Sequence, residues 1–323
     1  MSVIIFADQF QGKIKKSALE AVQYGAKVAQ QTGTSATAVV LGEVGAEELA
    51  LLGQYGAQKV LHAADARLNE PEAGVAAKVM AEAVAKENAA IIIFSHNFSG
   101  RAIAPQLSAN LKAGLVAGAI SLPDTSNGFV VKKNVFSGKA FANVNITSEK
   151  KIVSVLPNTF SLEAGSGTAT VEAFSPAINN TDFRIKVVKA ETITGEVPLT
   201  EAEIVVSGGR GLKGPENWGM VEDLAHALGA ATACSRPVAD SGWRPHHEHV
   251  GQTGFTVRPN LYVAIGISGA IQHLAGVNGS KVIVVVNKDP EAPFFKAADY
   301  GIVGDAFEIV PKLTEAVKKY KGN

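Results

Sequence analysis

Short apolar runs alternate with longer stretches of helical spacing along the first third of the chain. Four of the runs are predicted strands and span residues 3–7, 36–41, 59–62 and 90–95. Between them, apolar side chains recur at helical spacing, as at Leu19, Val22 and Ala26. The predicted helices span residues 17–31, 46–55, 71–87 and 101–112. This alternation of strands and helices predicts a parallel sheet covered by helices on both faces.

The pattern changes between residues 118 and 189, where β-branched and aromatic runs are separated by turn residues. Three of these runs are predicted antiparallel strands added to the first sheet, and they span residues 129–136, 139–146 and 151–156. Residues 163–170 are rich in Gly, Ser and Thr and predict a loop. Residues 191–200 include Gly195 and Pro198 and show no periodicity. They predict a linker that follows an N-terminal domain of residues 1–190.

Strand–helix alternation returns in residues 201–323, which predict a second domain. Its predicted strands span residues 203–207, 231–234, 261–265, 281–286 and 300–303. Its predicted helices span residues 218–228, 270–274, 292–298 and 310–320. The predicted fold class is therefore α/β, with two domains that are each a three-layer sandwich around a parallel sheet. Because the second sheet is expected to be doubly wound, its ligands should bind at the carboxyl ends of the strands.

The charge balance and the single cysteine narrow the classes of function. Lys and Arg number 30, and Asp and Glu also number 30, so no overall field favours nucleic acid or an anionic membrane surface. Cys234 is the only cysteine, which excludes an intramolecular disulfide and a metal site built from cysteines. No apolar run approaches the ~18 residues of a membrane span, and residues 1–8 resemble a strand more than a signal peptide. We expect a bacterial-type cytoplasmic protein with no targeting segment and no membrane insertion.

Glycine-rich loops follow two predicted strands of the second domain. Residues 207–211 place Arg210 among glycines, which suits either a tight turn or a phosphate held by backbone and guanidinium. Gly266 and Gly269 bracket Ser268 just before a predicted helix, whose N-terminus suits a pyrophosphate. The spacing is not the GxGxxG fingerprint, so it does not by itself predict dinucleotide binding.

Other polar residues at the predicted strand ends allow two interpretations each. Asn287 suits a turn or a ligand, and Asp305 suits a helix cap or a ribose hydroxyl. Residues 250–254 are either a surface turn or a loop that offers Gln252 and Thr253 to the edge of a heterocycle. His273 is either an ordinary helical residue or a hydrogen-bond donor that faces the ligand.

The chain offers no arrangement typical of a nucleophilic enzyme or of a metal site. His246, His247 and His249 cluster in a predicted loop, and no nearby cysteine completes a set of ligands, so no metal is expected. No Ser/His/Asp or Cys/His arrangement stands out, and no catalytic residue is predicted. Binding groups without proton shuttles favour an electron carrier. A nucleotide-dependent enzyme that uses NAD or ATP on a two-domain α/β scaffold remains the alternative.

Residues 261–305 closely resemble the signature of electron-transfer flavoprotein alpha subunits, and residues 207–217, 235–236 and 250–254 fall at the expected places before it. The first domain matches more weakly, around residues 100–115. The resemblance implies FAD in the second domain and a heterodimer with a smaller beta subunit that carries AMP or a second FAD. It also implies transient contact with flavoprotein dehydrogenases, such as the acyl-CoA dehydrogenases of fatty acid β-oxidation, and with a membrane quinone oxidoreductase or another acceptor.

The resemblance also implies roles for individual residues. Arg210 and Ser268 would meet the pyrophosphate and ribityl region, and Asn287 and Asp305 would hold the adenosine end. A further group would surround the isoalloxazine ring: Ser235, Arg236, Gln252, Thr253 and His273. Gly266, Gly269 and Gln272 complete the expected cofactor-binding set. Residues 243–249 depart from the family pattern, so the resemblance implies nothing for the three histidines. The donor, the acceptor, the beta-subunit nucleotide and the choice between ordinary and bifurcating transfer are not predicted.

Overall fold

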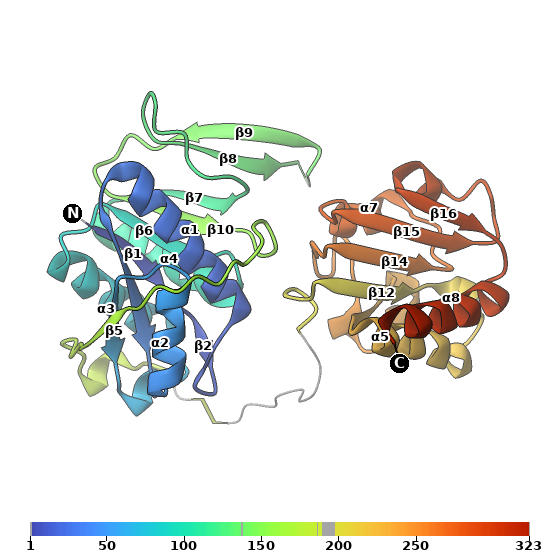
Figure 1. Cartoon of the computed structure of the whole chain (residues 1–323), viewed down its shortest axis with the longest axis horizontal. Helices are drawn as coiled ribbons and strands as arrows, with labels where there is room; N and C mark the ends of the chain where they lie inside the picture. Colours follow the sequence, from blue (N-terminus) through green and yellow to red (C-terminus); the bar gives the residue numbers. More distant parts are fainter. Residues whose placement is uncertain (1, 137, 186, 189–197, 323) are drawn as a thin grey trace. The chain divides into compact units, whose positions relative to one another are not determined.

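The computed structural model describes residues 2–136, 138–185, 187–188 and 198–322, which fall into two compact units. The first unit includes residues 2–135 and 139–188, and the second includes residues 198–322. Figure 1 colours the first unit from blue to yellow-green and the second from yellow to red. Most of the predicted linker, residues 191–200, lies outside the described residues, so its boundaries stay a prediction.

A nine-stranded sheet forms the centre of the first unit, counted over the residues that the structure describes. Its strands are β1 (Ser2–Phe6), β4 (Ser35–Leu41), β5 (Lys59–Ala63), β6 (Ile91–Ser95), β7 (Gly114–Ala119), β8 (Val130–Val135), β9 (Ala140–Asn145), β10 (Lys151–Val155) and β11 (Thr170–Ala173). Their order is β11-β5-β4-β1-β6-β10-β7-β8-β9, and the pairs that β8 forms with β7 and β9 are antiparallel. A separate hairpin consists of β2 (Gln9–Phe10) and β3 (Lys13–Ile14).

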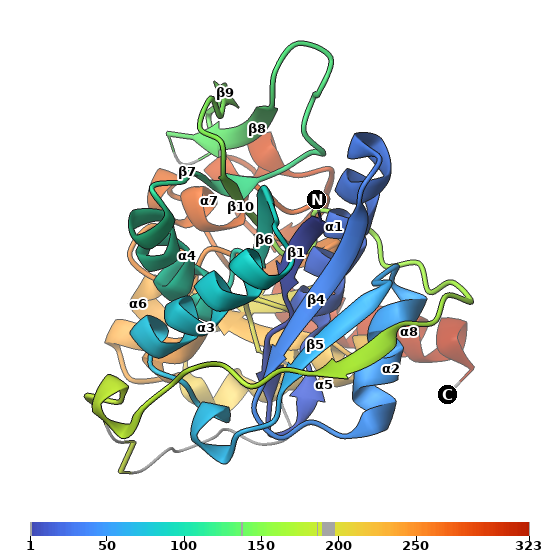
Figure 2. The same cartoon turned by 90° about the vertical axis from the view of Figure 1, so that its left-hand side faces the viewer.

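Helices cover both faces of this sheet, as Figure 2 shows. One face packs on α1 (Lys16–Thr32) and α2 (Ala46–Gln54), and the other on α3 (Ala73–Lys86) and α4 (Phe98–Leu111). Successive side chains of β1 alternate between the two cores, because Ile5 joins the first cluster and Ile4 the second. Two 3-10 turns, η1 (Ala66–Leu68) and η2 (Asn180–Asp182), complete the unit within the described residues.

The structure corrects the predicted direction of one strand. Residues 151–156 were expected to be antiparallel, but β10 lies between β6 and β7 and is parallel to both. Ile152 and Val153 are fully buried, which is the pattern of a central parallel strand with a core on each face. The strands β7 and β11 were not predicted. The predicted loop of residues 163–170 is wrong only at its end, where Thr170 begins β11.

The hairpin of β8 and β9 extends the first sheet as predicted. β9 forms one edge of the sheet among the described residues. Side chains along β9 alternate between exposed and half-buried, and Phe141 is exposed. The Lys132 ammonium of β8 lies 4.4 Å from the centroid of the Phe141 ring.

Five parallel strands form the sheet of the second unit, as predicted, counted over its described residues. They are β12 (Ile204–Gly208), β13 (Ala231–Cys234), β14 (Leu261–Ile265), β15 (Val282–Asn287) and β16 (Tyr300–Val303), in the order β13-β12-β14-β15-β16. The helices are α5 (Gly219–Leu228), α6 (Arg236–Asp240), α7 (Ile271–Val277) and α8 (Ala306–Lys321). The 3-10 turns are η3 (Arg210–Leu212), η4 (Pro215–Asn217), η5 (His246–Glu248) and η6 (Pro293–Ala297).

Two predicted helices of the second unit differ from the observed ones. The predicted helix of residues 292–298 is the 3-10 turn η6, a type used in short pieces. The helix predicted from residue 310 begins at Ala306, because the Asp305 carboxylate caps it by accepting from the N–H of Phe307 at 3.0 Å. Pro311 therefore lies inside α8.

The two faces of the second sheet have different covers. Val263 and Ile265 of β14 pack in a cluster with residues of α5 and α8. Tyr262 and Ala264 point to the other face, where α7, η6 and the irregular residues 250–257 supply the core. The segment begins at the carboxyl end of β13, where the Val250 N–H donates to the Cys234 carbonyl. The strand order of this sheet reverses between β12 and β14. No helix within the described residues combines the length and the hydropathy needed to cross a bilayer.

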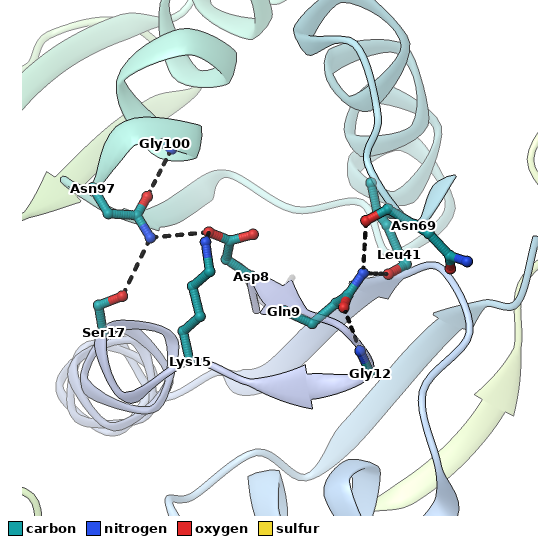
Figure 3. Close-up of polar contacts among 9 residues, drawn as sticks. All are labelled: Asp8, Gln9, Gly12, Lys15, Ser17, Leu41, Asn69, Asn97 and Gly100. Atoms are coloured by element: carbon teal, nitrogen blue, oxygen red, sulfur yellow. Dashed lines mark hydrogen bonds and ion pairs between the residues drawn. The ribbon is translucent and has the colours of Figure 1, made fainter. Parts of the chain in front are cut away.

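In the first unit, the strand order reverses between β1 and β6. Side chains of the same unit occupy the space at the carboxyl ends of these two strands (Figure 3). The Asp8 carboxylate, just after β1, accepts from Lys15 Nζ at 3.0 Å and from Asn97 Nδ2 at 3.0 Å. Asn97 Nδ2 also donates to Ser17 Oγ, and its Oδ1 caps α4 by accepting from the Gly100 N–H. Next to this group, the Gln9 amide donates to the Leu41 carbonyl at the end of β4 and to the Asn69 carbonyl just after η1. The charged and amide groups drawn in Figure 3 therefore find their partners within the unit.

Asp8→Asn should destabilise the first unit by about 2 kcal/mol, because it leaves the Lys15 ammonium without its anion. Both tryptophans, Trp218 and Trp243, belong to the second unit, so tryptophan fluorescence reports that unit alone. During urea unfolding we expect an earlier transition in far-ultraviolet circular dichroism and an unchanged fluorescence transition.

The matched control is Glu315→Gln, which removes the exposed ion pair with Lys318 in α8. Such pairs contribute less than about 1 kcal/mol, so neither transition should move measurably. If Asp8→Asn also leaves both transitions in place, the network of Figure 3 does not hold the first unit together.

Candidate functional site

A cavity of about 550 Å³ opens at the carboxyl edge of the second sheet. The loops that follow β12, β13, β14 and β15 line it together with residues 249–253 and the start of α7. It contains most of the predicted cofactor-binding residues: Arg210, Ser235, Arg236, Gln252, Thr253, Gly266, Ser268, Gln272, His273 and Asn287. Residues as distant in sequence as Arg210 and Asn287 thus meet, because the carboxyl ends of parallel strands lie at one edge of the sheet.

Two predicted residues lie outside this lining. Gly269 has a φ of 79°, and a Cβ there would lie 2.6 Å from the backbone nitrogen of Phe294. Only glycine permits both this backbone conformation and this close approach to η6. Asp305 caps α8, which is the first of its two predicted interpretations. A role for Asp305 at the adenosine end stays a prediction.

The glycine-rich loops after β12 and β14 pack directly on each other. The N–H groups of Gly209 and Gly211 donate to the carbonyls of Ile265 and Gly266 at 2.8 and 3.0 Å. A Cβ on Gly209 would overlap the Gly266 carbonyl, and Gly266 itself has a φ of 62°. The glycines are therefore required for loop-to-loop packing, and that packing fixes where Arg210 emerges.

Unpaired donors lie along one stretch of the cavity lining. The N–H groups of residues 268–272 donate to no other group among the described residues, and Ser268, Ala270 and Gln272 of this stretch line the cavity. The Arg210 guanidinium is exposed, and it makes no hydrogen bond or ion pair with any residue that the structure describes. Successive free N–H groups beside an arginine suit phosphate oxygens. The donor set thus fits the anionic part of a dinucleotide.

Both signs of charge occur at the cavity: Arg210 and Arg236 line it, Asp289 lines it as well, and Asp240 lies next to Arg236. Arg236 is the first residue of α6, and its side chain is 63% exposed. Its Nε lies 3.2 Å from the Asp240 carboxylate one turn later. Asp289 also lines the cavity, on the loop after β15. Ser235, just before α6, is buried, and its N–H donates to the Gly208 carbonyl.

Asn287 stabilises a turn, which is one of the two roles that the sequence predicted for it. Its Nδ2 donates to the Ile267 carbonyl at 3.0 Å, and its Oδ1 accepts from the Asp289 N–H at 3.0 Å. These bonds join the loops after β14 and β15 and leave one amide hydrogen for a ligand. Contact between Asn287 and a cofactor stays a prediction.

The segment that offers Gln252 and Thr253 is attached to α7 by its backbone. The Gln252 N–H donates to the Gln272 carbonyl at 2.7 Å, and a Cβ on Gly276 would lie 2.5 Å from the Gly251 nitrogen. The side chains of Gln252 and Thr253 remain exposed. A fixed backbone with free side chains can present an amide and a hydroxyl to the edge of a ring.

His273 is buried in the wall of the cavity. Burial, followed by the nearby His249, lowers its pKa to about 4, against a smaller raising effect of the Val250 carbonyl. The imidazole is therefore neutral at pH 7. Its Nε2 lies 2.9 Å from the Tyr262 hydroxyl, and its ring meets the edge of Phe294 at a centroid distance of 5.7 Å.

His249 lines the cavity, although the sequence assigned it no role. It is buried, and burial lowers its pKa, whereas His246 and His247 are exposed. The signal that places it is the backbone bridge between His249 and Cys234, which extends β13 and is invisible in a single sequence. The described residues contain no group of three or more potential ligands arranged to hold a metal ion.

Arg244 anchors the residues between α6 and η5. Its guanidinium pairs with the buried Glu248 and with Glu222 of α5, at 2.5 and 3.0 Å. It also lies 5.4 Å from the centroid of the Trp218 ring. The histidine-containing turn is thus held on α5, which directs His249 inward.

The walls supply the apolar part of the site through Pro237, Val250, Ile267, Ala270 and Ala292. A cavity within the roughly 300–1,000 Å³ range of cofactor sites, with apolar walls and a few convergent donors, suits a flat ring attached to phosphates. The residues present therefore fit a flavin dinucleotide.

Comparison with protein families places this chain among known proteins. The family described as "Electron transfer flavoprotein FAD-binding domain" matches residues 198–278, and "Electron transfer flavoprotein domain" matches residues 3–179. The first match covers most of the cavity lining.

Similar proteins align along nearly the whole chain. The electron transfer flavoprotein subunit alpha of Bacillus subtilis is 39% identical over 323 residues, which cover 98% of this chain and 97% of that protein. The corresponding subunit of Thermoanaerobacterium thermosaccharolyticum is 38% identical, with 98% of each chain covered. Protein FixB of Clostridium saccharobutylicum is 34% identical, with 98% and 96% covered. The chain therefore belongs to the family of electron transfer flavoprotein alpha subunits.

Proposed function

We propose that this chain binds FAD in the cavity of its second unit and is the FAD-binding subunit of a heterodimeric electron carrier. The observation that supports this most is the set of free N–H groups at residues 268–272 beside the unpaired Arg210, within a cavity that the FAD-binding domain match largely covers. The carrier has no substrate of its own and works in the cytoplasm.

The partners follow from the family. The similar proteins from Bacillus subtilis and Thermoanaerobacterium thermosaccharolyticum are named as alpha subunits, which supports assembly with a beta subunit. That subunit holds AMP or a second FAD. The pair accepts electrons from flavoprotein dehydrogenases such as acyl-CoA dehydrogenases. It delivers them singly to a membrane quinone oxidoreductase or another acceptor.

Each group of the predicted cofactor-binding residues has a distinct task. Arg210, Ser268 and the free N–H groups bind the pyrophosphate and ribityl region, and Gly266 and Gly269 shape the loop that carries them. Asn287 and Asp305 hold the adenosine end. The ring is surrounded by polar and cationic side chains: Ser235, Arg236, Gln252, Thr253, Gln272 and His273.

Bound FAD supplies the redox chemistry, since its ring accepts and releases electrons. The chain's own contribution is electrostatic. Arg236 stabilises added negative charge on the ring. Its exposure and its pairing with Asp240 reduce that effect. At ~4 Å in a water-like dielectric, one charge contributes about 1 kcal/mol, or roughly 45 mV for one electron.

Ala270→Trp should abolish FAD retention, because Ala270 is an exposed lining residue and an indole would occupy the cavity. The matched control, Ala297→Trp, places the same side chain on an exposed position of η6 away from the lining. The measurement is the visible absorption spectrum of each chain purified with its beta subunit. A yellow Ala270→Trp complex with full FAD content would show that FAD binds elsewhere, and a colourless wild-type complex would refute the proposed function.

Arg236→Ala should lower the midpoint potential of the bound flavin by about 45 mV or less, because it removes a cation near the ring. Asp240→Asn should shift the potential in the opposite direction, since it removes the anion that pairs with Arg236. Potentiometric titration of the two variants measures both shifts, and Lys296→Ala controls for a change of net charge in the same unit. If Arg236→Ala matches the wild-type potential, Arg236 does not tune the flavin.

A further inference from the structure

Tyr262 and His273 form a buried pair behind the wall of the cavity. Tyr262 is on β14 and is fully buried, and it does not line the cavity. Its hydroxyl lies 2.9 Å from Nε2 of His273, which does line the cavity. A substitution at Tyr262 therefore changes His273 without touching a ligand in the cavity.

The other ring nitrogen of His273 lacks a comparable partner. Nδ1 is buried and has no hydrogen bond of normal geometry among the described residues. The Val250 carbonyl is near enough to raise the pKa of His273 slightly, as an acceptor beside an N–H does. Leaving a buried N–H unsatisfied is unfavourable, so an unpartnered ring nitrogen in the wall of a cavity calls for an acceptor.

The surroundings of the pair keep both groups neutral. Burial raises the pKa of Tyr262 well above its ordinary value. The nearby Ser207 hydroxyl opposes this and the Cys234 thiol adds to it, and burial prevails, so the phenol keeps its proton. The titratable neighbour of His273 is His249, which burial also keeps neutral at pH 7. Phe294 packs against both rings. A neutral imidazole carries one proton, and the hydrogen bond at one nitrogen decides which nitrogen holds it.

We propose that Tyr262 is a positioning residue whose O–H donates to His273 Nε2, so that His273 carries its proton on Nδ1 and keeps that N–H for an acceptor atom of the bound flavin. The identity of the acceptor rests on the proposed function, whereas the tautomer is a property of the chain alone. The inference assigns a task to a residue outside the cofactor-binding set.

The tautomer is measurable in the cofactor-free, full-length chain by long-range ¹H–¹⁵N correlation spectra of ¹⁵N-histidine-labelled protein at pH 7. The chain has seven histidines, and His273→Gln identifies the signals of His273. We expect the Nδ1–H form in the wild type and a shift of population toward Nε2–H in Tyr262→Phe. The matched control is Tyr24→Phe, which removes another buried tyrosine hydroxyl, bonded to the Ser121 carbonyl in the first unit. It should leave the His273 signals unchanged.

The wild-type spectrum alone can overturn the proposal, even if Tyr262→Phe does not fold, because an Nε2–H form of His273 contradicts it directly. An unchanged tautomer in folded Tyr262→Phe also overturns it. In the FAD-loaded complex, Tyr262→Phe should weaken FAD retention about tenfold, the effect of one hydrogen bond, while Tyr24→Phe should not. If FAD fails to bind the wild type but the Nδ1–H form is present, the proposed function fails and the positioning role of Tyr262 stands.

Discussion

The contact between the two glycine loops after β12 and β14 is the constraint on which the site depends. The loops share backbone hydrogen bonds, and a side chain at Gly209 would collide with the Gly266 carbonyl. This packing holds Arg210 on one side and the free N–H groups of residues 268–272 on the other, so that both reach the same cavity. A wider separation of the loops would disperse these donors, whatever their individual chemistry. The glycines therefore act through geometry and the other lining residues act through charge and hydrogen bonding.

Both units contain a mainly parallel sheet covered on two faces, but the polar groups at the carboxyl edge of the sheet differ between them. In the first unit, Asp8, Lys15 and Asn97 satisfy one another and fill the point of strand reversal. In the second unit, the equivalent edge keeps donors without partners among its described residues. Because an unpaired polar group is costly in a folded protein, the first arrangement favours stability and the second favours a ligand. The fold alone thus does not decide which unit carries a cofactor; the residues at the strand ends do.

Sequence reasoning located the strands of the second unit and most residues of the cavity, because apolar runs and the polar residues after them are local features. It failed where the answer depends on distant pairing. The direction of β10 is set by its insertion between β6 and β7, and an apolar run contains no sign of that. The inward position of His249 depends on its bridge to Cys234 and on the ion pair between Arg244 and Glu248. Nothing in the sequence indicated a role for Tyr262, because a tyrosine within a buried strand has the same pattern as any aromatic residue of the core.

The edge strand β9 has a consequence for solubility. A parallel sheet of many strands ends in rows of unpaired backbone groups, which invite strands of other molecules to extend it into aggregates. On this edge, the ammonium of Lys132 lies over the exposed ring of Phe141. The ring gains a favourable partner, and an incoming strand meets a hydrated positive charge that it would have to displace. One lysine therefore protects the exposed aromatic residue of the edge strand from edge-to-edge association during folding and at high concentration.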